Sequence, residues 1–339
     1  MIPRMDTSRH IPAWQTALRQ AVGSVEELFS LLRLDTSGLE YCPGSREFPL
    51  RVPHSFIRRM EVGNRNDPLL RQILPLSEEL QETPGYGRDP LGERETMPIP
   101  GLLHKYHGRV LLTLTGACAV HCRYCFRRYF PYGEANPAAS HWDRMLGYLE
   151  RHEDISEIIL SGGDPLALPD TRLAELAGRI AVIPHVRTLR IHTRLPIVLP
   201  ERVDEELLAW LGNHPQRTVI VVHCNHPNEI DASVAGSMDK LKRAGSTLFN
   251  QTVLLSGIND NPATLVRLSE ALFDSGILPY YLHQLDRVRG SAHFEVNDTA
   301  ARKLMDGLHA TLPGYLVPRL VRETPAGVGK QLLWPYCHG

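Results

Sequence analysis

The sequence of 339 residues has no long apolar run and no excess of charge of either sign. None of its hydrophobic segments approaches the roughly 20 residues that cross a bilayer, and its first residues lack the apolar stretch of a signal peptide. Lysine and arginine total 37 against 38 aspartate and glutamate residues, which gives no net field to grip a phosphate backbone or an anionic lipid surface. We therefore expect a cytoplasmic protein that binds neither nucleic acid nor membrane.

Cysteine is also scarce, since six cysteines are too few for a disulfide scaffold in a chain of this length. Three of them, Cys118, Cys122 and Cys125, nevertheless fall within eight residues. Thiolates at this density favour a soft metal or an iron–sulfur cluster. A structural zinc ion needs four ligands, so a zinc site would require a distant fourth one such as His121 or Cys224. Three thiolates on a four-iron cluster would instead leave one iron open to a non-protein ligand.

The character of the chain changes near residue 100. Residues 1–100 are irregular, with short amphipathic helices expected at 14–21 and 25–32 and a loop rich in Pro, Gly and charge at 81–101. From residue 108, short β-branched runs alternate with helix-period segments, a pattern typical of parallel βα units. The expected strands cover residues 110–115, 157–161, 188–193, 218–223, 247–254 and 279–285, with a further candidate strand at 315–322.

Six βα units fall short of the eight in a closed barrel, which leaves an open partial barrel or a doubly wound sheet. Polar residues follow nearly every expected strand, and residues converging from so many strands suit the mouth of a barrel better than a single crevice. We therefore predict an α/β fold with a partial (βα)6 barrel over residues 101–314. A helical N-terminal region and linker (1–100) precede it, and a short C-terminal segment (315–339) follows it.

The sequence Ser161-Gly162-Gly163-Asp164-Pro165 directly follows an expected strand. Glycines at this place let the backbone approach a ligand, and the carbonyl groups or Asp164 are able to receive an ammonium group. The same residues would also suit a tight βα turn with no ligand.

The spacing of Cys118, Cys122 and Cys125, with the aromatic Tyr124 before the third cysteine, resembles the motif of the radical S-adenosylmethionine (SAM) superfamily. The resemblance implies that these cysteines hold a [4Fe–4S] cluster whose open iron binds the methionine part of SAM. The Ser161–Asp164 turn is similar to the glycine motif that contacts the amino group of SAM in this superfamily. The superfamily's usual partial barrel agrees with the predicted fold.

Lys330 follows a glycine-rich stretch, Pro325-Ala-Gly-Val-Gly. A P-loop is excluded, because Thr324 stands where its first glycine belongs and Gln331 follows the lysine. An isolated lysine of this kind is usually just solvated. From Leu103 to Lys330, however, the order of motifs resembles the lysine 2,3-aminomutase family, which uses pyridoxal phosphate (PLP) beside SAM. Lys330 matches the lysine that holds PLP, a role that requires a neutral amine.

The same resemblance assigns roles to further residues by position. It implies that Arg109 binds the PLP phosphate and that Tyr106 contacts the ring, whereas Lys105 replaces an arginine usual in these mutases and its phosphate role stays open. The remaining matches are Arg127 for the substrate α-carboxylate, Asp286 and Glu323 for the distal amino group of lysine, and His223 and Gln251 near SAM or the substrate.

The run Cys-Arg-Tyr-Cys-Phe-Arg-Arg-Tyr-Phe-Pro-Tyr resembles the branch that makes (R)-β-lysine for modification of translation elongation factor P. The chain also ends nine residues after Lys330, where the catabolic mutases have a long extension. This resemblance implies a 1,2-shift of the amino group of L-lysine, a link to elongation factor P and its lysyl-transfer enzyme, and a reducing protein such as flavodoxin or ferredoxin.

Two alternatives stay open at this point. A radical SAM and PLP aminomutase of this kind is also able to act on another amino acid, such as glutamate or arginine, although two acidic candidates, Asp286 and Glu323, favour a cationic side chain. A zinc-stabilised interaction protein without redox chemistry is the alternative from a different class.

Overall fold

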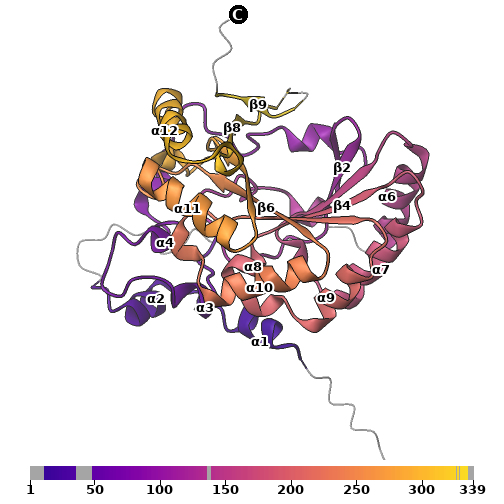
Figure 1. The fold of residues 1–339 in the computed structure, drawn as a ribbon, viewed down its shortest axis with the longest axis horizontal. Helices are drawn as coiled ribbons and strands as arrows, with labels where there is room; N and C mark the ends of the chain where they lie inside the picture. The colour runs from indigo at the N-terminus through magenta and orange to yellow at the C-terminus, as the bar shows by residue number, and fades with distance from the viewer. Residues whose placement is uncertain (1–10, 36–47, 136–138, 326, 328, 335–339) are drawn as a thin grey trace, which may run out of the picture.

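A computed structural model describes residues 11–35, 48–135, 139–325, 327 and 329–334 (Figure 1). One nine-stranded sheet dominates it, with the strands in sequential order from β1 to β9. The strands are β1 (Leu102–Tyr106), β2 (Arg109–Thr113), β3 (Glu157–Ser161), β4 (Thr188–Thr193), β5 (Arg217–Val222), β6 (Thr247–Val253), β7 (Leu278–His283), β8 (Arg319–Arg322) and β9 (Gln331–Leu332).

The strands from β2 to β8 are parallel, and only the two edge pairs, β1 with β2 and β8 with β9, are antiparallel. The longest helices of the six connections between the parallel strands are α6 (Ala139–Arg151), α7 (Asp170–Ala181), α9 (Glu205–Gly212), α10 (Ala232–Arg243), α11 (Pro262–Asp274) and α12 (Asp298–Thr311), and the four-residue helices α5 (Tyr132–Ala135) and α8 (Leu195–Val198) lie in the first and third connections. Figure 1 shows these helices following one another around the outside of the curved sheet. The predicted partial barrel of six βα units is therefore confirmed, and the sequential strand order excludes a doubly wound sheet.

The connecting helices bury apolar residues in a stripe along one face, and a side chain caps the start of four of them. In α7 the stripe consists of Leu173, Leu176, Ala177 and Ile180, all buried at helical spacing. The side chains of Asp204, Asp231, Asn261 and Asn297 accept hydrogen bonds from the first turns of α9, α10, α11 and α12. Each cap fixes where its helix begins and so sets the length of the loop that follows the preceding strand.

The N-terminal region contains α1 (Ala13–Arg19), α2 (Val25–Leu32), α3 (His54–Ile57), α4 (Pro68–Arg71) and the 3-10 turns η1 (Ser77–Leu80) and η2 (Glu93–Thr96). Its apolar side chains, such as Trp14, Phe56 and Leu69, belong to the same hydrophobic cluster as barrel residues such as Leu189 and Ile220. The helical character expected for this region is present. The region packs as a wall of the barrel and shares its core.

Two parts of the sheet differ from the predicted elements. β1 was not predicted and forms an edge hairpin with β2, in which Gly108 takes a φ of 74° that favours glycine. The stretch 315–322 begins as a 3-10 turn, η7 (Gly314–Leu316), and only its end is the strand β8. β8 and β9 extend the sheet, so the C-terminal segment brings Lys330 to the edge beside β7. Within the described residues no helix is both long and apolar enough to span a bilayer.

Candidate active site

The cysteine loop, residues 116–128, follows the carboxyl end of β2. Cys118, Cys122 and Cys125 are all free thiols in it. Burial and, to a smaller extent, the nearby charge of Cys122 raise the pKa of Cys125 to about 12. Burial likewise raises the pKa of Cys118, with contributions from Cys125 and Cys122. The neighbouring cysteines thus lie close enough to disfavour ionisation of Cys118 and Cys125, an effect that a positively charged iron core would reverse.

The sequence allows either a zinc ion or a [4Fe–4S] cluster at Cys118, Cys122 and Cys125, and the surroundings of these thiols favour the cluster. Among the described residues, no three His, Cys, Asp or Glu side chains form a group that would hold a single metal ion. The two candidate fourth zinc ligands are engaged elsewhere, since Cys224 Sγ donates to His226 O and His121 Nδ1 bonds Pro49 O. The three thiolates of a [4Fe–4S] cluster bind three different irons, so three free thiols on one loop fit such a cluster.

The N-terminal region fastens the cysteine loop through Glu79. Arg123 Nε and Nη2 donate to the two carboxylate oxygens of Glu79 at 2.7 and 2.5 Å, and Arg128 Nη2 donates to the second oxygen at 2.7 Å. The side chains of Arg123 and Glu79 are only 1% and 6% exposed. Burial alone would raise the pKa of Glu79, but the two arginines outweigh it and lower that pKa. These contacts hold the cysteine loop against the region that precedes the barrel.

The glycine turn after β3 braces the start of the cysteine loop. A Cβ atom on Gly162 would lie 2.6 Å from Thr115 O, and one on Gly163 would lie 2.5 Å from Ala117 O. Gly163 N donates to Thr115 O at 2.6 Å. Close backbone packing therefore requires both glycines, as a tight βα turn would, and their expected contact with a ligand stays a prediction.

Asp164 has partners other than the expected ammonium group. Its carboxylate accepts from Thr193 Oγ1 at 2.7 Å and from the backbone N–H groups of Arg194, Leu195 and Leu166. Burial raises its pKa to about 6, although these hydrogen bonds act in the opposite direction. The carboxylate is thus committed to the end of β4, and an amino group at this turn would meet backbone carbonyl groups.

Arg127 contacts the glycine turn through Ser161, and Glu93, which is not among the predicted site residues, holds its guanidinium. Its Nε and Nη2 donate to the carboxylate of Glu93 at 2.8 and 2.5 Å, and its Nη1 donates to Ser161 Oγ at 3.0 Å. This pair borders a cavity of about 290 Å³, lined by Arg88, Asp89, Glu93, Arg94, Phe126, Arg127, Tyr129, Phe130 and Pro131. The only sequence signal for Glu93 was its place in a charged loop.

Lys330 lies among the residues that the resemblance grouped with it. Its Nζ donates to Glu323 Oε2 at 2.8 Å and lies 5.5 Å from the centre of the Tyr281 ring. Tyr106 OH donates to Glu323 Oε1 at 2.7 Å. Burial alone would raise the pKa of Glu323, but Lys330 and Tyr106 hold it at about 2. Desolvation and the charge of Glu323 raise the pKa of Asp286 to about 7.

Lys105 and Arg109 differ in how they are used. Lys105 Nζ donates to Leu91 O, Glu323 Oε1 and Thr324 O at 3.3, 3.2 and 2.8 Å, which uses all three donors of an ammonium group. Lys105 therefore ties the segment before Lys330 to β1. The Arg109 guanidinium lies 4.7 Å from the centre of the Tyr106 ring, at the edge of the same cluster.

Three histidines, His192, His223 and His283, lie at or just after the ends of β4, β5 and β7. Gln251 Nε2 donates to His223 Nε2 at 2.5 Å, and the rings of His192 and His223 lie 6.3 Å apart. Burial lowers the pKa of all three imidazoles, to about 3 for His223, and the positive charge of Lys330 adds to this effect. The Nε2 atoms of His192 and His283 are buried and have no partner within the described structure. Such orphaned atoms fit a site completed by a ligand.

Comparison with known proteins gives a family for this arrangement. Residues 112–268 match the model of the Radical SAM superfamily. The chain is 48% identical over 312 residues to an L-lysine 2,3-aminomutase of Escherichia coli K12, covering 91% of both proteins. It is 43% identical over 333 residues to an L-lysine 2,3-aminomutase of Haemophilus influenzae, covering 98% of both. An L-lysine 2,3-aminomutase of Acetoanaerobium sticklandii is 34% identical over 328 residues, which cover 95% of this chain and 78% of that protein.

Proposed function

The chain belongs to the radical SAM superfamily and, within it, to the L-lysine 2,3-aminomutase family, and from this we propose that it isomerises L-lysine to β-lysine. The cofactors of such an enzyme are a [4Fe–4S] cluster, SAM and PLP. When bound, the cluster and SAM supply the one-electron chemistry that removes a hydrogen atom from lysine, and PLP supplies the π-system across which its amino group migrates. The observation that carries the proposal is the convergence of two carboxyl groups, Asp286 and Glu323, near Lys330.

We assign the cofactors to the residues that fit them. Cys118, Cys122 and Cys125 would hold the cluster, and the carbonyl groups of the glycine turn, with His223 and Gln251, would meet SAM. Lys330 would hold PLP covalently, with Arg109 at the phosphate and Tyr106 near the ring. Lys105 is left out of the phosphate site, because its three donors already bind protein oxygens.

The contact between Lys330 and Glu323 supports lysine as the substrate. Glu323 Oε2 accepts from a lysine ammonium group at 2.8 Å, and the same chemical group ends the side chain of the substrate. If Lys330 held PLP, Glu323 Oε2 would lose this ammonium partner while Lys105 stayed on Oε1, and the ε-ammonium of lysine would fit the vacated position. Asp286, whose pKa is raised to about 7 partly by the charge of Glu323, gains from the same cation. Glutamate, with an anionic end, would be repelled.

Arg127 is our candidate for the α-carboxylate of lysine. Glu93 and Ser161 hold its guanidinium rigidly, and its buried position lowers the dielectric in which a carboxylate would meet it. We expect Glu93 to orient Arg127.

We further propose that the product is (R)-β-lysine, used by a lysyl-transfer enzyme to modify elongation factor P. The resemblance of the run around Cys122 and Cys125 supports this branch. We place the enzyme in the cytoplasm, where free thiols and an iron–sulfur cluster are kept reduced, with flavodoxin or ferredoxin as electron donor.

The test is anaerobic incubation of the iron-loaded protein with SAM, PLP, a reductant and isotopically labelled L-lysine, followed by chiral chromatography. Labelled (R)-β-lysine is expected, and arginine and glutamate supplied in parallel should yield no β-amino acid. Formation of a β-amino acid from arginine or glutamate but not from lysine would contradict the substrate assignment. A colourless protein that binds zinc and no iron would contradict the enzyme class. A mass increase of elongation factor P after addition of its lysyl-transfer enzyme tests the branch.

A further inference from the structure

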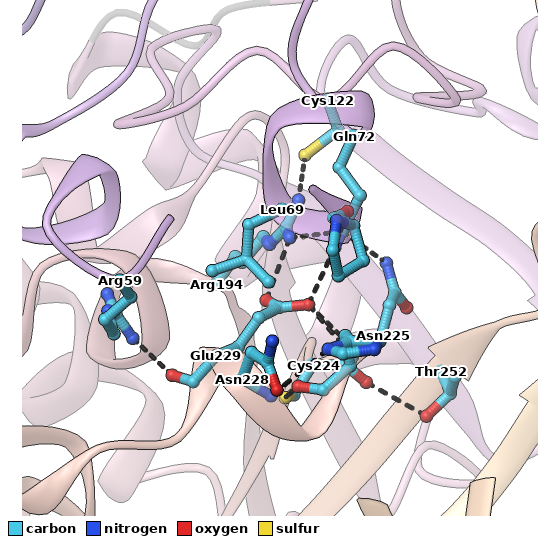
Figure 2. Close-up of polar contacts among 12 residues, drawn as sticks. Arg59, Leu69, Gln72, Cys122, Arg194, Cys224, Asn225, Asn228, Glu229 and Thr252 are labelled. Carbon is cyan, nitrogen blue, oxygen red and sulfur yellow. Dashed lines mark hydrogen bonds and ion pairs between the residues drawn. The ribbon is translucent and has the colours of Figure 1, made fainter. Parts of the chain in front are cut away.

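A buried polar network lies directly beneath Cys122, with Arg194 at its centre (Figure 2). Arg194 is the first residue after β4 and its side chain is 8% exposed. Its Nη1 donates to Cys122 Sγ and to Tyr124 OH, both at 2.7 Å. Its Nη2 donates to Gln72 Oε1 at 2.6 Å and to Glu229 Oε2 at 3.0 Å. One guanidinium thus joins the cysteine loop, the N-terminal region and the barrel.

The countercharge of Arg194 is itself fixed. Glu229 is completely buried, and its Oε1 accepts from Gln72 Nε2 at 3.0 Å and from Asn225 N at 2.9 Å. Figure 2 shows Glu229 on the far side of the Arg194 guanidinium from Cys122. The positive end of the pair therefore faces the sulfur and the negative end faces away. This orientation leaves a net attraction for negative charge at Cys122.

A hydrogen bond to a ligand sulfur stabilises the reduced form of an iron–sulfur cluster more than the oxidised form, because the added electron increases the negative charge on the sulfurs. The shift in reduction potential is constant only if the hydrogen-bond donor keeps its position at the sulfur. The four contacts of Arg194 within the protein, all buried or partly buried, provide such rigidity.

We propose that Arg194 is a positioning residue for the cluster, which fixes Cys122 through its sulfur and raises the reduction potential of the cluster. The proposal rests on the proposed function, since it requires that Cys118, Cys122 and Cys125 hold a [4Fe–4S] cluster. It concerns the protein's own residues and makes no use of lysine, SAM or PLP.

The chain offers a matched control in Arg202. This arginine is fully buried, and like Arg194 it forms an ion pair with a buried carboxylate, in this case Asp170 at 2.9 Å. Its Nε donates to Leu166 O at 2.6 Å, a contact within the barrel wall. Replacing Arg202 therefore breaks a buried ion pair of similar kind without removing a donor to a cysteine sulfur.

The experiment is a redox titration of the reconstituted protein in the absence of SAM, PLP and lysine, followed by electron paramagnetic resonance of the one-electron reduced cluster. At the midpoint potential of the parent, Arg194→Gln should lower the ratio of reduced to oxidised cluster about tenfold, equivalent to about 59 mV for one electron. Arg202→Gln should leave this ratio within twofold of the parent. An Arg194→Gln ratio within twofold of the parent would overturn the proposal.

Glu229→Gln should shift the reduction potential in the opposite direction. It tests the proposal on its own if Arg194→Gln binds no iron. This variant removes the countercharge while keeping the donor to Cys122, so the ratio of reduced to oxidised cluster should rise. A fall or no change would overturn the proposal, because general loosening of the network does not predict a rise. A parent protein that binds no iron would overturn the proposed function as well, whereas normal iron binding with unshifted potentials would overturn only the role of Arg194.

Discussion

The surroundings of the cysteine loop and those of Lys330 are both buried and rich in charged residues. They differ in how far the protein itself pairs these residues. Around the cysteine loop two buried carboxylates pair with arginines, Glu79 with Arg123 and Glu229 with Arg194. Around Lys330 the Nε2 atoms of His192 and His283 lack partners, and the pKa of Asp286 is raised to about 7. Ion pairs within the protein dominate the first region, whereas the second keeps imidazole and carboxyl groups that a ligand would pair.

This difference follows from what each region has to hold. A cluster loop must keep three sulfurs in place before metal arrives, and preorganised, charge-assisted contacts achieve this because they leave little to rearrange. A site for small molecules gains affinity when the ligand satisfies polar groups that were unpaired. Substitutions around the cysteine loop should therefore change stability and iron binding. Substitutions around Lys330 should change only the binding of small molecules.

The strongest test of the comparison is removal of the thiols. Replacing Cys118, Cys122 or Cys125 by Ala should abolish iron binding completely, because each thiolate is expected to bind its own iron. Cys224→Ala is the control and should keep the parent's iron content, since that buried thiol donates to His226 O. Iron and sulfide analysis after anaerobic reconstitution measures the outcome. Comparable iron loss in Cys224→Ala would show that the ligand set is different.

Lys330 should be the attachment point of PLP. Borohydride reduction followed by peptide mapping should find a phosphopyridoxyl group on Lys330, and Lys330→Ala should lose this label entirely. Lys105→Met is the matched control, because Lys105 also binds Glu323 but is expected to hold only the protein segment. A label on Lys105 in the parent protein would refute the assignment of both lysines.

The cysteine loop should depend on Glu79 for stability. Glu79→Gln leaves Arg123 and Arg128 without their buried carboxylate and should lower the free energy of unfolding by about 3 to 5 kcal/mol. Glu82→Gln is the control, because Glu82 is 80% exposed in its pair with Arg289 and should change stability by less than about 0.5 kcal/mol. Urea unfolding of the metal-free proteins measures both. Equal losses would mean that the clamp on the cysteine loop contributes no more than a surface pair.

The sequence predicted the barrel well because buried parallel strands appear as short apolar runs that end at turns. β3 and β4 occur at the residues expected for them, Glu157–Ser161 and Thr188–Thr193. β1 was missed because this edge strand contains the polar residues His104 and Lys105 and pairs irregularly with β2.

The candidate site, like the fold, contains residues that the sequence predicted and residues that it did not. Local spacing was sufficient to single out the three cysteines, and the resemblance supplied Lys330, Asp286 and Glu323. The partners that hold the cysteine loop were not predictable, because Glu79 meets Arg123 across 44 residues and Gln72 meets Arg194 across 122. Such contacts depend on how the N-terminal region packs against the barrel, which no local pattern encodes.

The smallest expected effect concerns pH at the Lys330 region. The ε-ammonium of lysine should bind the carboxylate form of Asp286, whose pKa of about 7 means that this group is mostly protonated below neutrality. Binding at low pH must then release a proton, so the affinity for lysine should be about tenfold weaker at pH 6 than at pH 8 and level off above that pH. Equilibrium dialysis of labelled lysine against the PLP-loaded protein measures this dependence.

Two variants separate Asp286 from its neighbours in that experiment. Asp286→Asn should bind lysine more weakly at pH 8 and lose most of the dependence on pH. Glu323→Gln should weaken binding by a similar factor at pH 6 and pH 8, because Tyr106 and Lys105 still lower the pKa of Glu323 when Lys330 holds PLP. His223 does not interfere, since burial lowers its pKa to about 3 and keeps it neutral throughout. A dependence on pH that survives in Asp286→Asn but disappears in Glu323→Gln would reverse the roles of the two carboxyl groups, and the Lys330 region would then be organised around Glu323.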